Sequence, residues 1–169
     1  METAQIKNSV LDRQSISRKM RRMALEVAEQ NLDEKELIIA GITGNGEVVA
    51  RNLIQELKSV SPAHSTILIT IVLNKKDPLE VSFNRTLDFE NKVIILVDDV
   101  ANTGRTMMYA LKPFLNAHPK KIQTLVLVER SHKLFPLQTD YTGLSIATTL
   151  QEHIVVETEG EEISGAWLY

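Results

Sequence analysis

The sequence contains no cysteine, and aromatic residues make up only 5% of its 169 residues. The absence of cysteine excludes disulfide bonds and thiolate metal sites, and it is typical of proteins that work in a reducing cytoplasm. No apolar run is long enough to cross a bilayer, and residues 1–8 lack the apolar core of a signal peptide. We therefore expect a cytoplasmic protein without a membrane segment.

Charge and length narrow the class of protein further. The formal net charge is −3, which argues weakly against a protein whose whole surface binds nucleic acid. Hydrophobic residues make up 43% and charged residues 24%, the proportions of an ordinary globular protein. A chain of this length fits one domain, so we expect a single domain over residues 1–169.

Apolar segments with strand character alternate with segments of helical spacing along the chain. This order predicts an α/β fold, a parallel sheet flanked by helices on both faces. Such sheets bind their ligands in the loops that follow the carboxyl ends of the strands. The expected helices are Ser15–Gln30, Glu47–Lys58 and Arg105–Leu115, and the expected strands are Leu37–Ile42, Thr66–Leu73, Val93–Val97, Ile122–Val128 and Ile154–Val156.

The most informative loop follows the third of these strands. Asp98 and Asp99 come directly after the strand, and a turn with Thr103, Gly104 and Thr106 then opens a helix. The free N–H groups at a helix start favour a phosphate, and the threonines add hydroxyl donors. Ionised aspartates only accept hydrogen bonds or ligate hard cations, so they suit a sugar with free hydroxyls or a hydrated Mg²⁺.

Simpler interpretations of this loop fit less well. A plain helix cap needs a single Ser, Thr or Asp, and two adjacent like charges at a strand end cost energy unless a ligand uses them. An ATP-binding P-loop would need a lysine where Arg105 stands. A receiver domain would place its acidic pair after the first strand instead.

The segment Val93–Thr106 resembles the phosphoribosyl-diphosphate (PRPP) loop of type I phosphoribosyltransferases, in which Asp-Asp, three residues and Thr-Gly-x-Thr follow an apolar run. A larger part of the chain resembles the PyrR family, bifunctional regulators of pyrimidine operons and uracil phosphoribosyltransferases. The resemblance implies the type I phosphoribosyltransferase fold with a small hood region. Its other matching segments are Leu11-Asp12, Gly41-Ile42, Val128–His132 and Asp140–Gly143.

The resemblance also implies a role for each loop. Asp98 and Asp99 would be the catalytic pair, holding the ribose hydroxyls and a Mg²⁺ ion. The base would be framed by Arg130, Asp140 and Tyr141, largely through main-chain groups. The 5′-phosphate would be bound by Ala101, Asn102, Thr103, Gly104, Arg105 and Thr106, and the pyrophosphate by Thr43, Gly44, Asn45, Gly46 and Lys75.

The implied activity is transfer of a phosphoribosyl group from PRPP to a nucleobase, with uracil favoured and pyrophosphate released. The implied ligands are PRPP, a nucleobase, a nucleoside monophosphate and Mg²⁺, and the implied assembly is a homodimer or a higher homo-oligomer. The alternative is a PyrR-like regulator that binds nucleotides, PRPP or RNA and has little catalysis.

Three segments depart from the PyrR pattern. The pyrophosphate loop is typically Lys-Thr-Arg-Gly, but Thr43–Gly46 contains no cation. Asn74-Lys75 stands where the family usually has Tyr-Arg, so a lysine would act as a point charge in place of a bidentate arginine. The first helix carries a basic cluster, but without the expected Thr-Arg pair and His, which makes RNA the less favoured partner. That cluster is Arg18, Lys19, Arg21 and Arg22.

Overall fold

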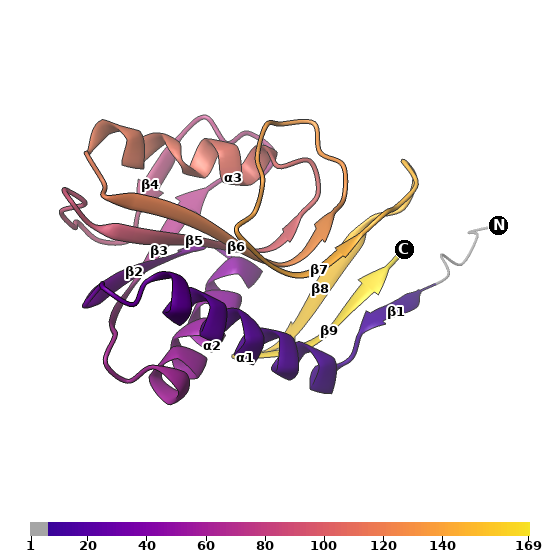
Figure 1. Cartoon of the computed structure of the whole chain (residues 1–169). Helices are drawn as coiled ribbons and strands as arrows, with labels where there is room; N and C mark the ends of the chain where they lie inside the picture. Colours follow the sequence, from indigo (N-terminus) through magenta and orange to yellow (C-terminus); the bar gives the residue numbers. More distant parts are fainter. Residues whose placement is uncertain (1–6) are drawn as a thin grey trace.

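The computed structural model describes residues 7–169, which form one large sheet and one small sheet (Figure 1). The helices are α1 Arg13–Gln30, α2 Asn45–Val60 and α3 Arg105–Ala110, with a 3₁₀ helix η1 at Lys112–Asn116. The strands are β1 Asn8–Leu11, β2 Glu36–Ile42, β3 Ser65–Leu73, β4 Val81–Phe83, β5 Val93–Ala101, β6 Lys121–Arg130, β7 Tyr141–Ile146, β8 Ile154–Glu159 and β9 Glu162–Leu168.

The large sheet has the strand order β4-β3-β2-β5-β6-β7. All its neighbouring strands run parallel except β4, which pairs antiparallel with β3. The central strand β5 is buried over most of its length, as expected for a parallel strand covered on both faces. The predicted α/β fold with a mainly parallel sheet is confirmed.

Alternate residues of β5 face two separate hydrophobic cores. Ile95 and Val97 pack with α1 and α2 on one face of the sheet. Ile94 and Leu96 pack on the other face with Phe114 of η1 and with side chains of α3. Figure 1 shows the same arrangement, with α1 and α2 on one side of the sheet and α3 on the other.

The small sheet, which we call the hood, consists of β1, β9 and β8 in that order, paired antiparallel. It lies beside the large sheet and places Asn8 of β1 opposite Leu168 of β9 (Figure 1). Ile154, Val156, Ile163 and Ala166 of the hood are buried in the core shared with α1 and α2. The hood is therefore packed against the body of the protein.

Two expectations about the elements are wrong. Ile154–Val156 is a strand, but it belongs to the hood, and the sixth strand of the large sheet is Tyr141–Ile146. The predicted helix Arg105–Leu115 ends at Ala110 and continues as η1, because Pro113 has no N–H to donate within an α-helix. Within residues 7–169, no helix combines the length and apolar character needed to cross a membrane.

Candidate active site

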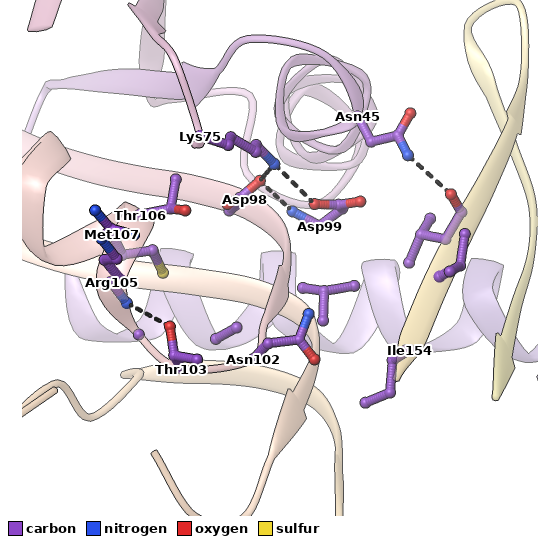
Figure 2. A pocket seen from close by; sticks show the side chains of 15 residues that line it. Asn45, Lys75, Asp98, Asp99, Asn102, Thr103, Arg105, Thr106, Met107 and Ile154 are labelled. Atoms are coloured by element: carbon purple, nitrogen blue, oxygen red, sulfur yellow. Dashed lines mark hydrogen bonds and ion pairs between the residues drawn. The ribbon is translucent and has the colours of Figure 1, made fainter. Parts of the chain in front are cut away.

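A cavity of about 220 Å³ opens at the carboxyl end of β5, beneath the hood (Figure 2). Residues 98–107 form its floor, and Lys75 closes one side. Asn45 at the start of α2 and residues 154–156 of β8 form the opposite side. The structure therefore brings together the acidic pair, the predicted phosphate loop and one residue of each predicted pyrophosphate segment.

The acidic pair is largely withdrawn from solvent. Asp98 is 1% exposed and Asp99 is 8% exposed. Asp98 Oδ1 accepts a hydrogen bond of 2.9 Å from the N–H of Asp99. Burial and then the charge of Asp99 raise the pKa of Asp98 well above its ordinary value, against the opposing effect of Lys75. The site thus holds a carboxyl group whose ionisation depends on a nearby cation.

Lys75 supplies a cation at this point. Its Nζ lies 3.4 Å from Asp98 Oδ1 and 3.7 Å from Asp99 Oδ1, and Figure 2 shows the side chain reaching across to both carboxylates. Burial lowers the pKa of Lys75, but the two carboxylates together outweigh this effect and raise it. Lys75 therefore stays charged and neutralises part of the acidic pair.

The predicted phosphate loop turns sharply at Gly104. Its φ of +82° lies in the left-handed region, which glycine adopts without the strain that a side chain would add. Thr103 Oγ1 accepts a hydrogen bond of 3.2 Å from the N–H of Arg105. Among the described residues, the N–H groups of Thr103 and Gly104 have no acceptor. The loop can therefore offer main-chain donors to an anion.

Asn102 lies in the same loop and lines the cavity. Its Oδ1 is buried and has no hydrogen-bond partner within residues 7–169. A buried acceptor of this kind normally finds a donor, so the amide is available to a ligand.

The predicted pyrophosphate loop is only partly in the cavity. Gly44, with φ of +88°, precedes α2, and neither it nor Thr43 lines the cavity. Gly46 allows close packing, because a Cβ built there would lie 2.8 Å from Asp98 Oδ1. The Asn45 side chain turns toward β8, where its Nδ2 donates to the carbonyl oxygen of Val156 at 2.8 Å (Figure 2). This loop therefore contributes close packing and a link to the hood.

The side chains predicted to frame the base have partners of their own. Arg130 donates to the carbonyl oxygen of Thr149 at 2.8 Å. Asp140 Oδ2 accepts from the N–H of Thr124 at 2.7 Å. Tyr141 is fully buried, burial raises its pKa to about 12, and its hydroxyl donates to Gln123 Oε1. None of these three side chains lines the cavity, so base recognition there stays a prediction about main-chain groups.

Sequence reasoning missed the apolar wall of the cavity. Ile154, Val155 and Val156 of β8 lie across from the phosphate loop. Their apolar, β-branched character indicated a strand, but nothing in the local pattern indicated that this strand would leave the main sheet and cover the site.

The donor set also limits how a metal could bind. Among residues 7–169, no group of three or more His, Cys, Asp or Glu side chains could hold a metal ion. Asp98 and Asp99 offer carboxylate oxygens only. This fits Mg²⁺, which commonly takes one or two protein carboxylates and completes its shell with water and substrate oxygens.

The parallel sheet, the hood and an acidic pair that leads into a glycine turn together define a type I phosphoribosyltransferase. The sequence pattern described as "Phosphoribosyl transferase domain" matches residues 7–161. The Bifunctional protein PyrR of Staphylococcus carnosus is 34% identical over 166 residues, covering 89% of this chain and 93% of the relative. The corresponding protein of Haemophilus ducreyi is 33% identical over 89% of each. The chain belongs to the PyrR family of phosphoribosyltransferases.

Solved structures show the same fold at low sequence identity. A hypoxanthine-guanine phosphoribosyltransferase from Bacillus anthracis superposes with a TM-score of 0.76 at 18% identity, covering 95% of this chain and 97% of that one. The hypoxanthine phosphoribosyltransferase of Trypanosoma cruzi gives a TM-score of 0.75 at 14% identity over 93% of each chain. At this identity the likeness shows the fold alone.

Proposed function

We propose that the protein transfers the phosphoribosyl group of PRPP to a nucleobase, with uracil as the favoured base. The observation that carries this proposal is the single cavity that joins the Asp98–Asp99 pair, the loop Asn102–Thr106 and Lys75. Each part suits a different group of PRPP, and the PyrR family membership supports the choice of a pyrimidine.

The substrate would lie along the carboxyl end of β5. The 5′-phosphate would accept hydrogen bonds from N–H groups at Thr103 and Gly104 and from the threonine hydroxyls. The ribose hydroxyls would donate to Asp98 and Asp99, because ionised carboxylates only accept hydrogen bonds. The sugar would thereby be fixed between the phosphate loop and the acidic pair.

In the reaction, the bond between ribose C1 and the pyrophosphate oxygen breaks, and a bond forms from C1 to a nitrogen of the base. The nitrogen loses its proton, and the pyrophosphate leaves with the bonding electrons. The transition state should resemble an oxocarbenium ion, as in glycosyl transfer generally. The carboxylates of Asp98 and Asp99 would stabilise the positive charge that develops on the sugar.

Charge on the leaving pyrophosphate needs a cation. Two cationic residues line the cavity, Lys75 and Arg105 of the phosphate loop. Asp98 and Asp99 would help to hold a Mg²⁺ ion. Bound there, the ion would neutralise charge on the pyrophosphate.

The second candidate function is a regulator that binds nucleotides or PRPP and has little catalysis. It is favoured by the loop Thr43–Gly46, which has no cation and whose Asn45 side chain is bound to β8. RNA stays the less favoured partner, because Lys19 and Arg22 of the basic cluster donate to main-chain oxygens of β7. A cytoplasmic location and assembly into a homodimer or higher oligomer remain predictions.

A panel of bases would separate the two functions. Uracil, hypoxanthine, guanine, xanthine, adenine and orotate are each incubated with PRPP and Mg²⁺, and pyrophosphate release is measured. We expect release with uracil, and none with the Asp98→Asn, Asp99→Asn double variant. Binding of uridine monophosphate without product from any base would favour the regulator. Failure to bind PRPP or any nucleotide would contradict both.

A further inference from the structure

The segment Ser131–Thr139, which follows β6, lies directly behind the phosphate loop. The carbonyl oxygen of Thr103 accepts hydrogen bonds from the N–H groups of both Leu134 and Phe135, at 3.0 and 3.1 Å. The peptide unit of this carbonyl carries the N–H of Gly104, which has no acceptor among the described residues. The orientation of this peptide is therefore set from behind by Ser131–Thr139.

Side chains of the same segment pack against the turn at Gly104. A Cβ built on Gly104 would lie 3.5 Å from both Leu137 Cβ and Lys133 Cδ, and 3.6 Å from the carbonyl oxygen of Phe135. These separations leave room for a methyl group at Gly104, so the loop is held to the segment mainly by the two hydrogen bonds to the carbonyl oxygen of Thr103. A shift of Ser131–Thr139 would be transmitted to the phosphate loop.

A partly buried ion pair fixes this segment to the large sheet. Lys133 Nζ lies 2.8 Å from Glu129 Oε2, and the two side chains are only 11% and 16% exposed. Thr139 Oγ1 donates to the same Glu129 oxygen at 2.7 Å. Glu129 belongs to β6 and pairs with Ala101, the last residue of β5 before the phosphate loop. One carboxylate therefore holds Ser131–Thr139 near both of its ends.

The charge state of Glu129 agrees with this geometry. Burial raises the pKa of Glu129, but the hydrogen bonds from Lys133 and Thr139 outweigh burial and lower it. Burying an ion pair costs desolvation, and a hydrophobic pair of similar size is often as stable. The pair is therefore better explained by the geometry that it imposes than by a gain in stability.

We propose that Lys133, paired with Glu129, is a positioning residue that sets the phosphate loop for the 5′-phosphate of the substrate. Lys133 acts through the carbonyl oxygen of Thr103, because its own side chain does not line the cavity. This inference rests on the proposed phosphoribosyl site and adds a residue that the PRPP motif does not include.

The test compares two ligands that use different parts of the cavity. Calorimetry measures the affinity for ribose 5-phosphate and, separately, for pyrophosphate with Mg²⁺. Lys133→Met keeps most of the side-chain stem behind Gly104 and removes the ammonium. We expect this variant to bind ribose 5-phosphate roughly tenfold more weakly, the effect of about one charge-assisted hydrogen bond. Its affinity for pyrophosphate should stay within about twofold of the wild-type value. Lys133→Arg should restore the affinity for ribose 5-phosphate.

Two further variants serve as controls. Lys120→Met makes the same substitution in a more exposed ion pair, Lys120–Glu34 at 2.6 Å, whose residues do not line the cavity, and it should leave both affinities unchanged. Thr139→Val removes the hydroxyl that bonds Glu129 and, at 2.6 Å, the hydroxyl of Thr142. Thr139→Val should lower the affinity for ribose 5-phosphate by a smaller factor than Lys133→Met does. It provides the decisive measurement if Lys133→Met does not fold.

Three results would overturn the inference. Wild-type affinity for ribose 5-phosphate in both Lys133→Met and Thr139→Val would show that the loop does not depend on the pair. An equal loss of affinity for both ligands would show that the substitution destabilises the protein in general and does not act on the phosphate loop. A wild-type protein that binds neither ribose 5-phosphate nor uridine monophosphate would contradict the proposed function itself, and this inference with it.

Discussion

At the scale of single residues, the acidic pair has the environment of a ligand site. Asp98 is almost fully buried next to a second carboxylate, and its nearest cation, Lys75, is 46% exposed. Neighbouring like charges in a buried place raise the free energy of the folded protein. A ligand with hydroxyl donors or a divalent cation would relieve that repulsion. Substitution of these aspartates by asparagine tests this interpretation.

The first prediction concerns ligand binding. Asp98→Asn together with Asp99→Asn should weaken the binding of PRPP and uridine monophosphate, while the free energy of unfolding holds or rises. The amide keeps an oxygen that can accept from the N–H of Asp99 or its replacement, so the local geometry is retained. Calorimetry with uridine monophosphate checks the affinity, and urea unfolding checks the stability. Unchanged affinity would show that the pair does not hold the ribose.

The second prediction concerns pH. Below the ordinary pKa of 3.8, Asp98 is protonated in both the folded and the unfolded protein. As the pH rises from 3.8 to the raised pKa of the folded state, the unfolded chain ionises first, so stability is lost across this window. Asp98→Asn lacks this titration. Its advantage in free energy of unfolding over the wild type should therefore grow across the window.

Urea unfolding at several pH values from about 4 to 8 measures this difference. Asp77→Asn, at an exposed position on the loop after β3, provides the matched control for the change from aspartate to asparagine. A constant difference between Asp98→Asn and the wild type would mean that the carboxyl group titrates normally in the folded protein.

At the scale of elements, α2 holds the hood over the cavity through two asparagines. Asn45 donates to the carbonyl oxygen of Val156 at 2.8 Å and accepts from Thr158 at 3.2 Å. Asn52, farther along the helix, donates to the carbonyl oxygen of Glu161 at 2.9 Å. Only the first of these links meets a strand segment that lines the cavity.

The third prediction uses this pair of residues. Asn45→Ala and Asn52→Ala should each lower the free energy of unfolding by about 1 kcal/mol per hydrogen bond lost. Only Asn45→Ala should also lower the affinity for PRPP, because it releases the cavity wall formed by β8. Thermal unfolding and PRPP titration of both variants check this. Equal PRPP affinities in the two variants would contradict the link between Asn45 and the cavity.

At the scale of the whole molecule, basic side chains from α1 cover part of β7, the edge strand of the large sheet. Arg22 donates to the carbonyl oxygens of Thr142 and Gly143, both at 2.9 Å, and Lys19 donates to that of Gly143 at 3.0 Å. Unpaired edge groups are sites where further strands can add, and charged side chains commonly block them. Part of the basic cluster on α1 therefore has a structural role.

The fourth prediction follows from that role. Lys19→Met together with Arg22→Met should lower the free energy of unfolding by about 1–2 kcal/mol and increase aggregation, because the edge carbonyls lose charged donors. Arg18→Met, an exposed position on the same helix, is the control. Urea unfolding and light scattering measure both effects. Equal behaviour of the double variant and the control would show that the edge does not need these donors.

The sequence by itself determined the features that depend on neighbours along the chain. The periodicity of apolar residues predicted the main helices and the strands β2, β3, β5 and β6. The loop Asp98–Thr106 could be predicted because its carboxylates, hydroxyls and glycine all lie within one strand-to-helix turn. The residue types of this loop could therefore be identified without long-range packing, whereas the burial of Asp98 and its ion pair with Lys75 could not.

Only the tertiary structure decided which distant segments meet. Asn45 and Val156 are 111 residues apart, yet their hydrogen bond turns a predicted pyrophosphate residue toward the hood. Ile154–Val156 is apolar and was predicted as a strand, whereas Tyr141–Ile146 also contains Thr, Gly and Ser, and neither pattern shows which segment joins the large sheet. That choice depends on the total burial and backbone pairing that each arrangement allows, and so do the cavity wall and the support of the phosphate loop by Lys133.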